Sequence, residues 1–472
     1  MFGRKFLSAG VGTLLAQIVN LACIPLLARL YEPAAYGMWA LVQAMALVIG
    51  GLSTLRYDLA IVVEPDHIKA QRLFFVTGLL AFCVSSLAIL VLAAGQYFLF
   101  VGSEPISGAM IVLLGAWVLM LAASQLLQSW LMREEAFLLI SLAQIGNVVV
   151  ANLVQLAAYA IGGASWLVGG SVVGQFVAVA ILFLALRRSP QAPEWRSPDW
   201  LRASLDVLRS HSRFPRFSLP FSILSLIRER APLFVLGIYA TPAQVGLFSQ
   251  IWRLANVPVG LTSSALRPVM FQRAAAVGTQ NAESAVQGLL RGLALFGAPL
   301  VVVAIFWHRE LVPLVLGPTW ADAGAYVPAV ALPAFLFALT NWMDRLLDVA
   351  GRQDLNLKLE AVAALLGTGA LALFLHFGAE AESAAHAQGF GLILSYLAFL
   401  YCAFSALRYS TKRLSVTLGM ATLLLVLTAG ASWATKLVFN YPQSLMVLGS
   451  VITCFSIVLV LQLRSRLLDR RR

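Results

Sequence analysis

Charged side chains are scarce in this 472-residue chain, where Asp, Glu, Lys and Arg make up only 11% of the residues. An ordinary soluble domain has about 25%. Hydrophobic residues account for 60% of the sequence, and the mean hydropathy is +0.85. Soluble domains of this length could not bury so much apolar surface. The shortage of charge therefore excludes a soluble enzyme and a disordered protein, and it indicates a polytopic membrane protein.

Cysteine and histidine are also rare, with four and five residues. Each cysteine lies in an apolar run, without a second Cys or a His at metal-ligand spacing. No histidine forms a catalytic arrangement with a carboxylate or a nucleophile in the sequence, and no glycine-rich phosphate loop is present. We therefore predict that the protein is not an enzyme and that it holds no metal and no cofactor. ATP hydrolysis is excluded on the same grounds.

Long apolar runs alternate with short loops along the whole chain. A helix needs about 20 apolar residues to cross the hydrocarbon core of a bilayer, which is about 30 Å thick. The sequence predicts an all-α membrane protein with about 14 transmembrane helices. They cover residues 6–28, 36–55, 73–96, 107–132, 137–161, 164–186, 216–240, 244–267, 289–308, 324–343, 357–377, 387–407, 414–436 and 444–463.

The net charge of +12 is unevenly placed along this pattern. If both termini are cytoplasmic, three of the 33 lysines and arginines fall in outer segments, namely Arg29, Arg309 and Lys436. Four more, Arg228, Arg230, Arg253 and Arg267, are assigned to spans, and the others lie in cytoplasmic segments or at the cytoplasmic ends of spans. Such a bias is typical of multi-pass membrane proteins. It predicts cytoplasmic termini, and it explains the basic charge without nucleic acid.

One loop, at 187–215, is long, and it is predicted to be cytoplasmic. It begins with two arginines and a proline-containing stretch, and Leu205 and Leu208 then follow Trp200-Leu201 at helical spacing. Arginines occupy the other faces of these turns. The pattern favours an amphipathic helix on the inner membrane surface, with a solvated linker as the alternative.

A sequence repeat relates the two halves of the chain. Pro33-Ala34-Ala35-Tyr36-Gly37, in a segment that ends at Arg56, recurs as Pro242-Ala243-Gln244-Val245-Gly246, in a segment that ends at Arg267. Six predicted spans separate the copies, so the copies share an orientation. The repeat predicts two parallel six-helix lobes, and chance similarity of apolar segments is the alternative. The predicted parts are an N-lobe at 1–186, the linker at 187–215, a C-lobe at 216–407, and a C-terminal helix pair with a basic tail at 408–472.

Two stretches resemble a known family. Leu27-Ala28-Arg29-Leu30-Tyr31-Glu32-Pro33-Ala34-Ala35-Tyr36-Gly37 and Thr54-Leu55-Arg56-Tyr57-Asp58-Leu59-Ala60-Ile61-Val62 are similar to the opening of Wzx-type polysaccharide flippases. These belong to the polysaccharide transporter branch of the MOP superfamily, whose fold is MATE-like. The resemblance implies translocation of undecaprenyl-diphosphate-linked oligosaccharide units from the cytoplasmic to the periplasmic leaflet of the bacterial inner membrane, for O-antigen, capsule or exopolysaccharide. It implies a lipid-linked substrate in contact with membrane lipids, and a polysaccharide polymerase and a chain-length regulator as partners.

Arginines inside the spans suit such a substrate. The guanidinium group matches phosphate geometry and stays charged when it is partly buried, and charged residues in spans usually face a cavity or a partner. The predicted diphosphate-binding residues are Arg228, Arg230 and Arg253. Helical steps of about 100° place Arg228 and Arg230 on different faces, so one of them is expected to line the path. A salt-bridge network is the alternative interpretation.

Further polar residues complete the predicted site. Arg56 and Arg267 are equivalent in the repeat and lie near the cytoplasmic ends of their spans, where they could form an entrance or serve only as positive-inside anchors. Asp58 is expected to pair with Arg56 or with Arg72 in a gate. Neutral polar or aromatic side chains within spans either join helices or contact sugar, and the candidates for sugar contacts are Gln17, Asn20, Gln144, Asn147, Trp252 and Asn341.

Three other functions fit parts of the sequence. A MATE-type drug or cation antiporter would favour buried carboxylates, whereas the acid well inside a span is Glu229, flanked by two arginines. A peptidoglycan-precursor flippase would have similar cavity chemistry. A membrane polysaccharide polymerase or ligase would need large periplasmic loops, but the predicted outer loops are short.

Overall fold

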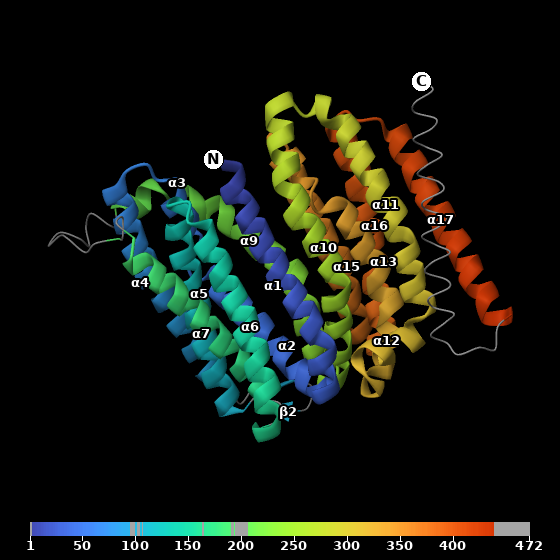
Figure 1. The fold of residues 1–472 in the computed structure, drawn as a ribbon, viewed down its shortest axis with the longest axis horizontal. Coiled ribbons are helices and arrows are strands. Elements are labelled where there is room, and N and C mark those ends of the chain that lie inside the picture. The colour runs from blue at the N-terminus through green and yellow to red at the C-terminus, as the bar shows by residue number, and fades with distance from the viewer. Residues whose placement is uncertain are drawn as a thin grey trace. The chain divides into compact units, whose positions relative to one another are not determined.

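The computed structural model describes residues 2–94, 100–101, 104–105, 107–162, 165–189, 193 and 206–438. Helices dominate this part of the chain, beside a two-residue pairing between β1 (Phe100–Val101) and β2 (Glu104–Pro105) (Figure 1). Ten helical segments in the described ranges are long and apolar enough to cross a membrane. The prediction of an all-α, multi-pass membrane protein is confirmed. The count of about 14 stays a prediction, and the span predicted at 444–463 lies outside the described residues.

Two compact units make up the chain, Met1–Ser249 and Gln250–Arg472. The first contains helices of two kinds, long apolar ones and a short one, α3, that follows a sharp bend. Its elements are α1 (Phe2–Leu30), α2 (Pro33–Leu52), α3 (Tyr57–Val63), α4 (His67–Ala94), α5 (Gly108–Arg133), α6 (Phe137–Gly162), α7 (Ser165–Arg187), a π-helical turn (Phe214–Ser218), α9 (Leu219–Tyr239) and the beginning of α10 (Pro242–Val277).

Local sequence explains where several of these helices begin. Pro33 and Pro242 occupy the first positions of α2 and α10, where a missing N–H costs nothing and a fixed φ favours the helix. The Ser107 hydroxyl accepts a hydrogen bond from the Met110 N–H and so caps α5. The two copies of the repeat thus both begin their helices with a proline at the first helical position.

Side-by-side packing of the long helices builds the first unit. α6 packs against α7 and α1, while α5 packs against α7, α2 and α4 (Figure 1). A hydrophobic cluster lies where α3, α4, α5 and α7 meet, and it includes the wholly buried Trp130 and Leu182. Val207, at the end of the linker, is buried in the same cluster. The described end of the linker is therefore anchored to the core of the first unit.

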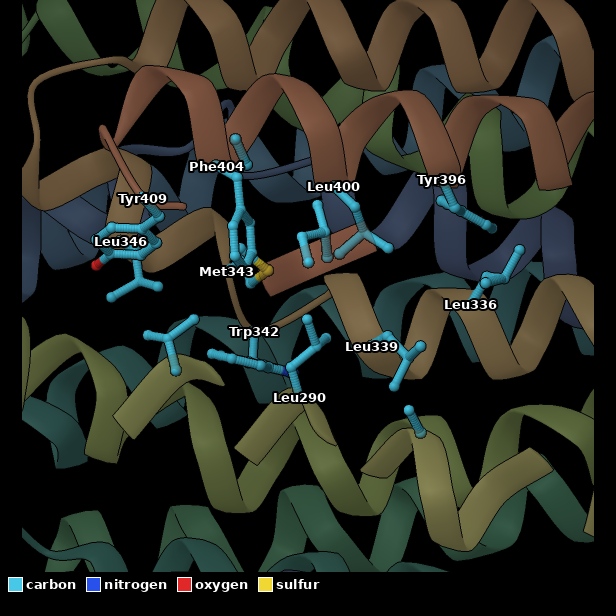
Figure 2. Close-up of a cluster of buried hydrophobic side chains, with 14 of the residues drawn as sticks. Leu290, Leu336, Leu339, Trp342, Met343, Leu346, Tyr396, Leu400, Phe404 and Tyr409 are labelled. Atoms are coloured by element: carbon cyan, nitrogen blue, oxygen red, sulfur yellow. The ribbon is translucent and has the colours of Figure 1, made fainter. Parts of the chain in front are cut away.

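The second unit has its own core. Its elements after α10 are α11 (Glu283–Phe306), α12 (His308–Leu316), a 3-10 segment (Pro318–Tyr326), α13 (Val327–Thr340), α14 (Asp344–Val349), α15 (Gln353–His376), α16 (Ala381–Ala406) and α17 (Thr411–Val438). Leu290, Leu339, Trp342, Leu400 and Phe404 converge in one buried cluster (Figure 2). Residues of α17 also contribute to this cluster, so α17 packs as part of the unit.

Candidate functional site

The two copies of the repeat motif meet in the first unit at a pair of glycines. A Cβ atom added to Gly37 would overlap the carbonyl oxygen of Pro242, and one added to Gly246 would overlap the carbonyl oxygen of Pro33. The contact is therefore reciprocal, as expected for two equivalent elements related by a twofold axis. Only glycine permits such close approach of two helix backbones. The pairing explains why both copies of the motif carry glycine four residues after proline.

The arginines of the seventh predicted span lie in α9, on either side of a carboxylate. Arg228 is buried, and its Nη2 lies 3.5 Å from Oε1 of Glu229. Arg230 is half-buried, and its Nε atom is buried without a hydrogen-bond partner. The differing burial agrees with the prediction that the two arginines occupy different faces. Arg228–Glu229–Arg230 thus carries one net positive charge within an apolar helix.

A polar cluster surrounds Asp58 at the bend between α2 and α3. Asp58 is buried, and its carboxylate accepts hydrogen bonds from the Thr54 hydroxyl at 2.7 Å and from Nε2 of Gln125 at 3.1 Å. Nη1 of Arg56 lies 3.9 Å from the same carboxylate. Of the two partners predicted for Asp58, this unit pairs it with Arg56. Gln125 also belongs to the cluster, which the sequence did not predict because 67 residues separate it from Asp58.

The bend is strained. Leu55 and Arg56 both have positive φ values, of 50° and 65°. For residues other than glycine this conformation costs about 1–2 kcal/mol each. Strain of this kind persists only where surrounding contacts hold it, and it is common at functional sites. The hydrogen bonds to Asp58 supply those contacts here.

Arg267, the repeat equivalent of Arg56, is also paired with an aspartate. Its Nε donates to Oδ1 of Asp344 at 3.2 Å, and its Nη2 donates to Oδ2 of the same residue. Asp344 additionally lies 3.9 Å from Nε of Arg345. The bidentate geometry is the stronger form of arginine–carboxylate contact. Asp344 is a residue of the site that sequence reasoning missed, because the pairing joins α10 to the beginning of α14.

Amide side chains of the first unit hydrogen-bond neighbouring helices. Nδ2 of Asn147 on α6 donates to Oε1 of Gln175 on α7 at 2.7 Å, and Nε2 of Gln175 donates to the Ser124 hydroxyl on α5 at 2.9 Å. This network joins three helices by side-chain hydrogen bonds, as polar residues between transmembrane helices commonly do. Gln17 differs, because its Oε1 is buried without a hydrogen-bond partner. Asn20 and Gln144 are half-buried on α1 and α6.

The remaining predicted residues lie in the second unit. Arg253 and Trp252 are half-buried in α10, and the Trp252 carbonyl accepts a hydrogen bond from Asn256. Nδ2 of Asn341 donates to the Val259 carbonyl at 3.1 Å, while its Oδ1 is buried without a partner. The roles of these residues in sugar or diphosphate binding stay predictions.

The end of the linker forms a histidine–carboxylate contact that the sequence analysis did not foresee. Nε2 of His211 lies 2.9 Å from Oε2 of the buried Glu64. The expectation that no histidine forms an arrangement with a carboxylate is therefore wrong for His211. The sequence could not reveal this contact, because 147 residues separate the pair along the chain. Trp200, Leu201 and Leu205 of the predicted amphipathic helix lie outside the described residues. Leu208 is described, and its carbonyl accepts a hydrogen bond from the Tyr57 hydroxyl at 3.4 Å.

Solved structures of helical membrane transporters share this architecture. One described as "Lipid II flippase MurJ, inward closed conformation" superposes with a TM-score of 0.75 at 12% identity, over 97% of this chain and 99% of that chain. An inward-facing multidrug resistance MATE transporter of the MOP superfamily gives 0.57 at 15% identity, over 86% and 95%. A MATE protein in complex with MaL6 gives 0.54 at 16% identity, over 86% and 96%. The fold is therefore that of MurJ and the MATE transporters.

Sequence comparison then gives the family. A family model described as polysaccharide biosynthesis protein matches residues 26–325, well over half of the chain. No curated protein matches the sequence. The chain belongs to the polysaccharide biosynthesis protein family, with the fold of the MOP superfamily, and the family resemblance identified in the sequence is confirmed.

Proposed function

We propose that this protein is a flippase that moves undecaprenyl-diphosphate-linked oligosaccharide units from the cytoplasmic to the periplasmic leaflet of the bacterial inner membrane. Membership of a polysaccharide biosynthesis family supports the pathway, and the MurJ and MATE fold supports transport by alternating access. The observation that carries the proposal is the net positive charge of Arg228–Glu229–Arg230 inside an apolar helix. A negatively charged diphosphate group can leave water only if a fixed positive charge in the protein offsets its own charge.

The chemistry of the cargo explains the choice of arginine. A diphosphate group loses its hydration when it enters a low-dielectric path, and fixed cations must replace that hydration. A guanidinium group keeps its charge under these conditions and donates two parallel hydrogen bonds to phosphate oxygens. Arg230 is the best placed of the α9 arginines to do so, since its buried Nε has no hydrogen-bond partner. Arg228 already lies near Glu229 and would hold that carboxylate away from the cargo.

The arginines at the helix ends would act at an entrance. Arg56 and Arg267 are both held by aspartates, loosely by Asp58 and in bidentate geometry by Asp344. A diphosphate that reaches them would compete with these carboxylates for the guanidinium groups. Exchange of partners would then couple substrate arrival to movement of the strained bend at Leu55 and Arg56. Arg253 is proposed as a further diphosphate contact, and Gln17, Asn20, Gln144, Asn147, Trp252 and Asn341 as sugar contacts.

Substitutions in α9 test the proposal. Arg230→Ala and Arg228→Ala should abolish surface polysaccharide while the protein still reaches the membrane, and Arg230→Lys should restore part of it. Arg209→Ala is a suitable control, because that side chain is 82% exposed in the linker. The readouts are polysaccharide on gels and protein by immunoblot of membrane fractions. Normal polysaccharide in both α9 alanine variants would contradict the cationic path.

A second candidate is a flippase for the peptidoglycan precursor. The extent of the likeness to the lipid II flippase structure favours it, since that match covers nearly the whole of both chains. Both cargoes carry a diphosphate on a polyprenyl lipid, so α9 would serve either. Rescue of a strain depleted of its lipid II flippase would favour this candidate over the first. In either case the cytoplasmic termini, and contacts with a polymerase and a chain-length regulator, are part of the proposal.

A further inference from the structure

A cationic pocket lies in the second unit, between α11 and α17, and it is separate from the arginines of the transport proposal. Its volume is about 490 Å³. α11 contributes Gln287, Gly288 and Arg291, and α17 contributes Lys412, Arg413 and Met420. The pocket therefore brings Arg291 together with two adjacent cations, Lys412 and Arg413, that follow it by 121 and 122 residues.

Core packing fixes these cations in place. Val286 and Leu290 of α11 are wholly buried in the hydrophobic cluster, where Leu290 appears beside Trp342 (Figure 2). Gln287 and Arg291 each follow one of these residues by one position, about 100° further round the helix, so they lie beside the buried face. On α17, Leu414 and Leu424 face the same cluster. The pocket side of both helices is thus held in place by the adjoining buried side.

The described protein groups do not neutralise this charge. In the part of the chain that the structure describes, no carboxylate oxygen lies within 4.0 Å of a cationic nitrogen of Arg291, Lys412 or Arg413. Nε of Arg291 is buried without a hydrogen-bond partner. The nearby carboxylate of Glu283 accepts the Ser410 N–H at 3.0 Å and offsets at most one of the three positive charges.

The position of Lys412 and Arg413 also points to an anion. Both residues lie in the first turn of α17, where the helix dipole disfavours cations and favours anions. Two backbone N–H groups at this helix end already have acceptors, because the Ser410 N–H donates to Oε1 of Glu283 and the Arg413 N–H donates to the Ser410 hydroxyl. A bound phosphate would therefore be held mainly by the cationic side chains. Three cations, Arg291, Lys412 and Arg413, against the one nearby carboxylate of Glu283 leave a net positive charge of two, which favours a bound anion.

Apolar surface continues from the pocket along α17. Val416, Met420, Leu423 and Leu427 follow one another at helical spacing, and Val416, Leu423 and Leu427 are about half or more exposed. At 1.5 Å per residue this stripe extends roughly 17 Å along the helix, close to half of a hydrocarbon core that is about 30 Å thick. A polar pocket joined to an apolar stripe of this length fits one amphiphile, with its headgroup in the pocket and its chains on the stripe.

We propose that the pocket between α11 and α17 binds the phosphate group of an anionic membrane lipid. Arg291, Lys412 and Arg413 contact the phosphate, and the stripe from Val416 to Leu427 contacts the chains. Both a bulk phospholipid such as phosphatidylglycerol and a polyprenyl phosphate carry this chemistry. The site does not depend on the proposed transport function, and its cations are distinct from those of α9.

Native mass spectrometry of the purified full-length protein tests the site. The wild type should retain phosphatidylglycerol in preference to phosphatidylcholine of the same chain length. Removal of one positive charge, as in Arg291→Gln or Lys412→Gln, should weaken phosphatidylglycerol binding by about fivefold, and removal of both should weaken it more. Lys358→Gln is the matched control, because Lys358 is 76% exposed and lies 3.8 Å from Asp354. Equal retention of the two lipids by the wild type would overturn the proposal.

A second variant tests the pocket without altering its charge. A Cβ atom at Gly288 meets no atom within 4 Å, so Gly288→Trp can fill the pocket without a backbone collision. Gly430→Trp is its control, since Gly430 is exposed on α17 and also faces open space. Loss of phosphatidylglycerol binding in Gly288→Trp alone would support the site, and retention in that folded variant would overturn it.

Competition identifies the source of the phosphate. Displacement of phosphatidylglycerol by undecaprenyl phosphate, but not by inorganic phosphate, would support a lipid site and assign it to the polyprenyl carrier. Resistance to both would support a phospholipid site. Displacement by inorganic phosphate at an equal concentration would show that the lipid chains contribute nothing, and would overturn the assignment of the stripe.

Discussion

Substitution of Gly37 or Gly246 tests the contact between the two repeat copies. In Gly37→Ala the new Cβ meets the Pro242 carbonyl, and in Gly246→Ala it meets the Pro33 carbonyl. A helix carbonyl cannot rotate away as a side chain can, so α2 and α10 must separate. Overpacking of this kind costs about 1–3 kcal/mol. Alanine in a helix returns about 1 kcal/mol relative to glycine, so the net loss of stability should be between about 0 and 2 kcal/mol.

A control variant removes the propensity term from this comparison. Gly430→Ala places a Cβ in open space on α17 and should gain the helix propensity without a collision. The thermal unfolding midpoint of each purified variant, measured by intrinsic fluorescence, should therefore be lower for Gly37→Ala and Gly246→Ala than for Gly430→Ala. The difference in stability should reach about 1–3 kcal/mol.

The double variant sharpens the test. Once α2 and α10 have separated to admit one Cβ, the second should cost less, so the loss in Gly37→Ala/Gly246→Ala should be smaller than the sum of the single losses. Residues in direct contact usually show coupling energies of about 0.5–3 kcal/mol. Strict additivity, or a Gly37→Ala protein as stable as Gly430→Ala, would refute the reciprocal contact.

Three further predictions concern polar contacts. Asp58→Asn should lower the unfolding midpoint by an amount equivalent to about 1–3 kcal/mol, because a buried acceptor that serves two donors is altered; an unchanged midpoint would contradict this. Arg267→Ala and Asp344→Ala should each destabilise the protein, but the double variant should lose less than their sum in a double-mutant cycle, and additive losses would exclude direct pairing. Burial, with a contribution from the Glu283 carboxylate, raises the pKa of Tyr409 to about 12. The contribution of Tyr409 to stability is present below pH 10 and falls as pH rises from about 10 to 12. Tyr409→Phe should therefore flatten that part of the profile of stability against pH. An unaltered profile would contradict the proposed contribution of Tyr409.

The long apolar runs in the sequence predicted the fold, because the length and the apolar character of a helix are local properties of the sequence. Each of the thirteen predicted spans up to residue 436 coincides with a helix of the structure, although only some meet the length and hydropathy expected for a span. The repeat was also visible, because Pro33 and Pro242 set the same helix start and Gly37 and Gly246 permit the same close contact.

Pairings between distant residues could not be predicted. Asp344 belongs with Arg267, and Glu64 with His211, through contacts that the sequence separates by 77 and 147 residues. Hydropathy also gave no sign of the left-handed bend at Arg56, since its surrounding residues are ordinary for a span end. Charge within spans marked where chemistry was to be sought, but the partner of each charge depends on tertiary packing.

The most direct test of the proposed flippase activity is the fate of the lipid-linked oligosaccharide in a strain without this protein. Lipids would be extracted, and intact spheroplasts would be treated with a glycosidase that reaches only the periplasmic leaflet. The account predicts that diphosphate-linked oligosaccharide accumulates and stays shielded from the enzyme, and that Arg230→Ala gives the same result. Accumulated oligosaccharide that the enzyme cleaves would place the block after translocation, and an absence of accumulation would contradict the proposed cargo.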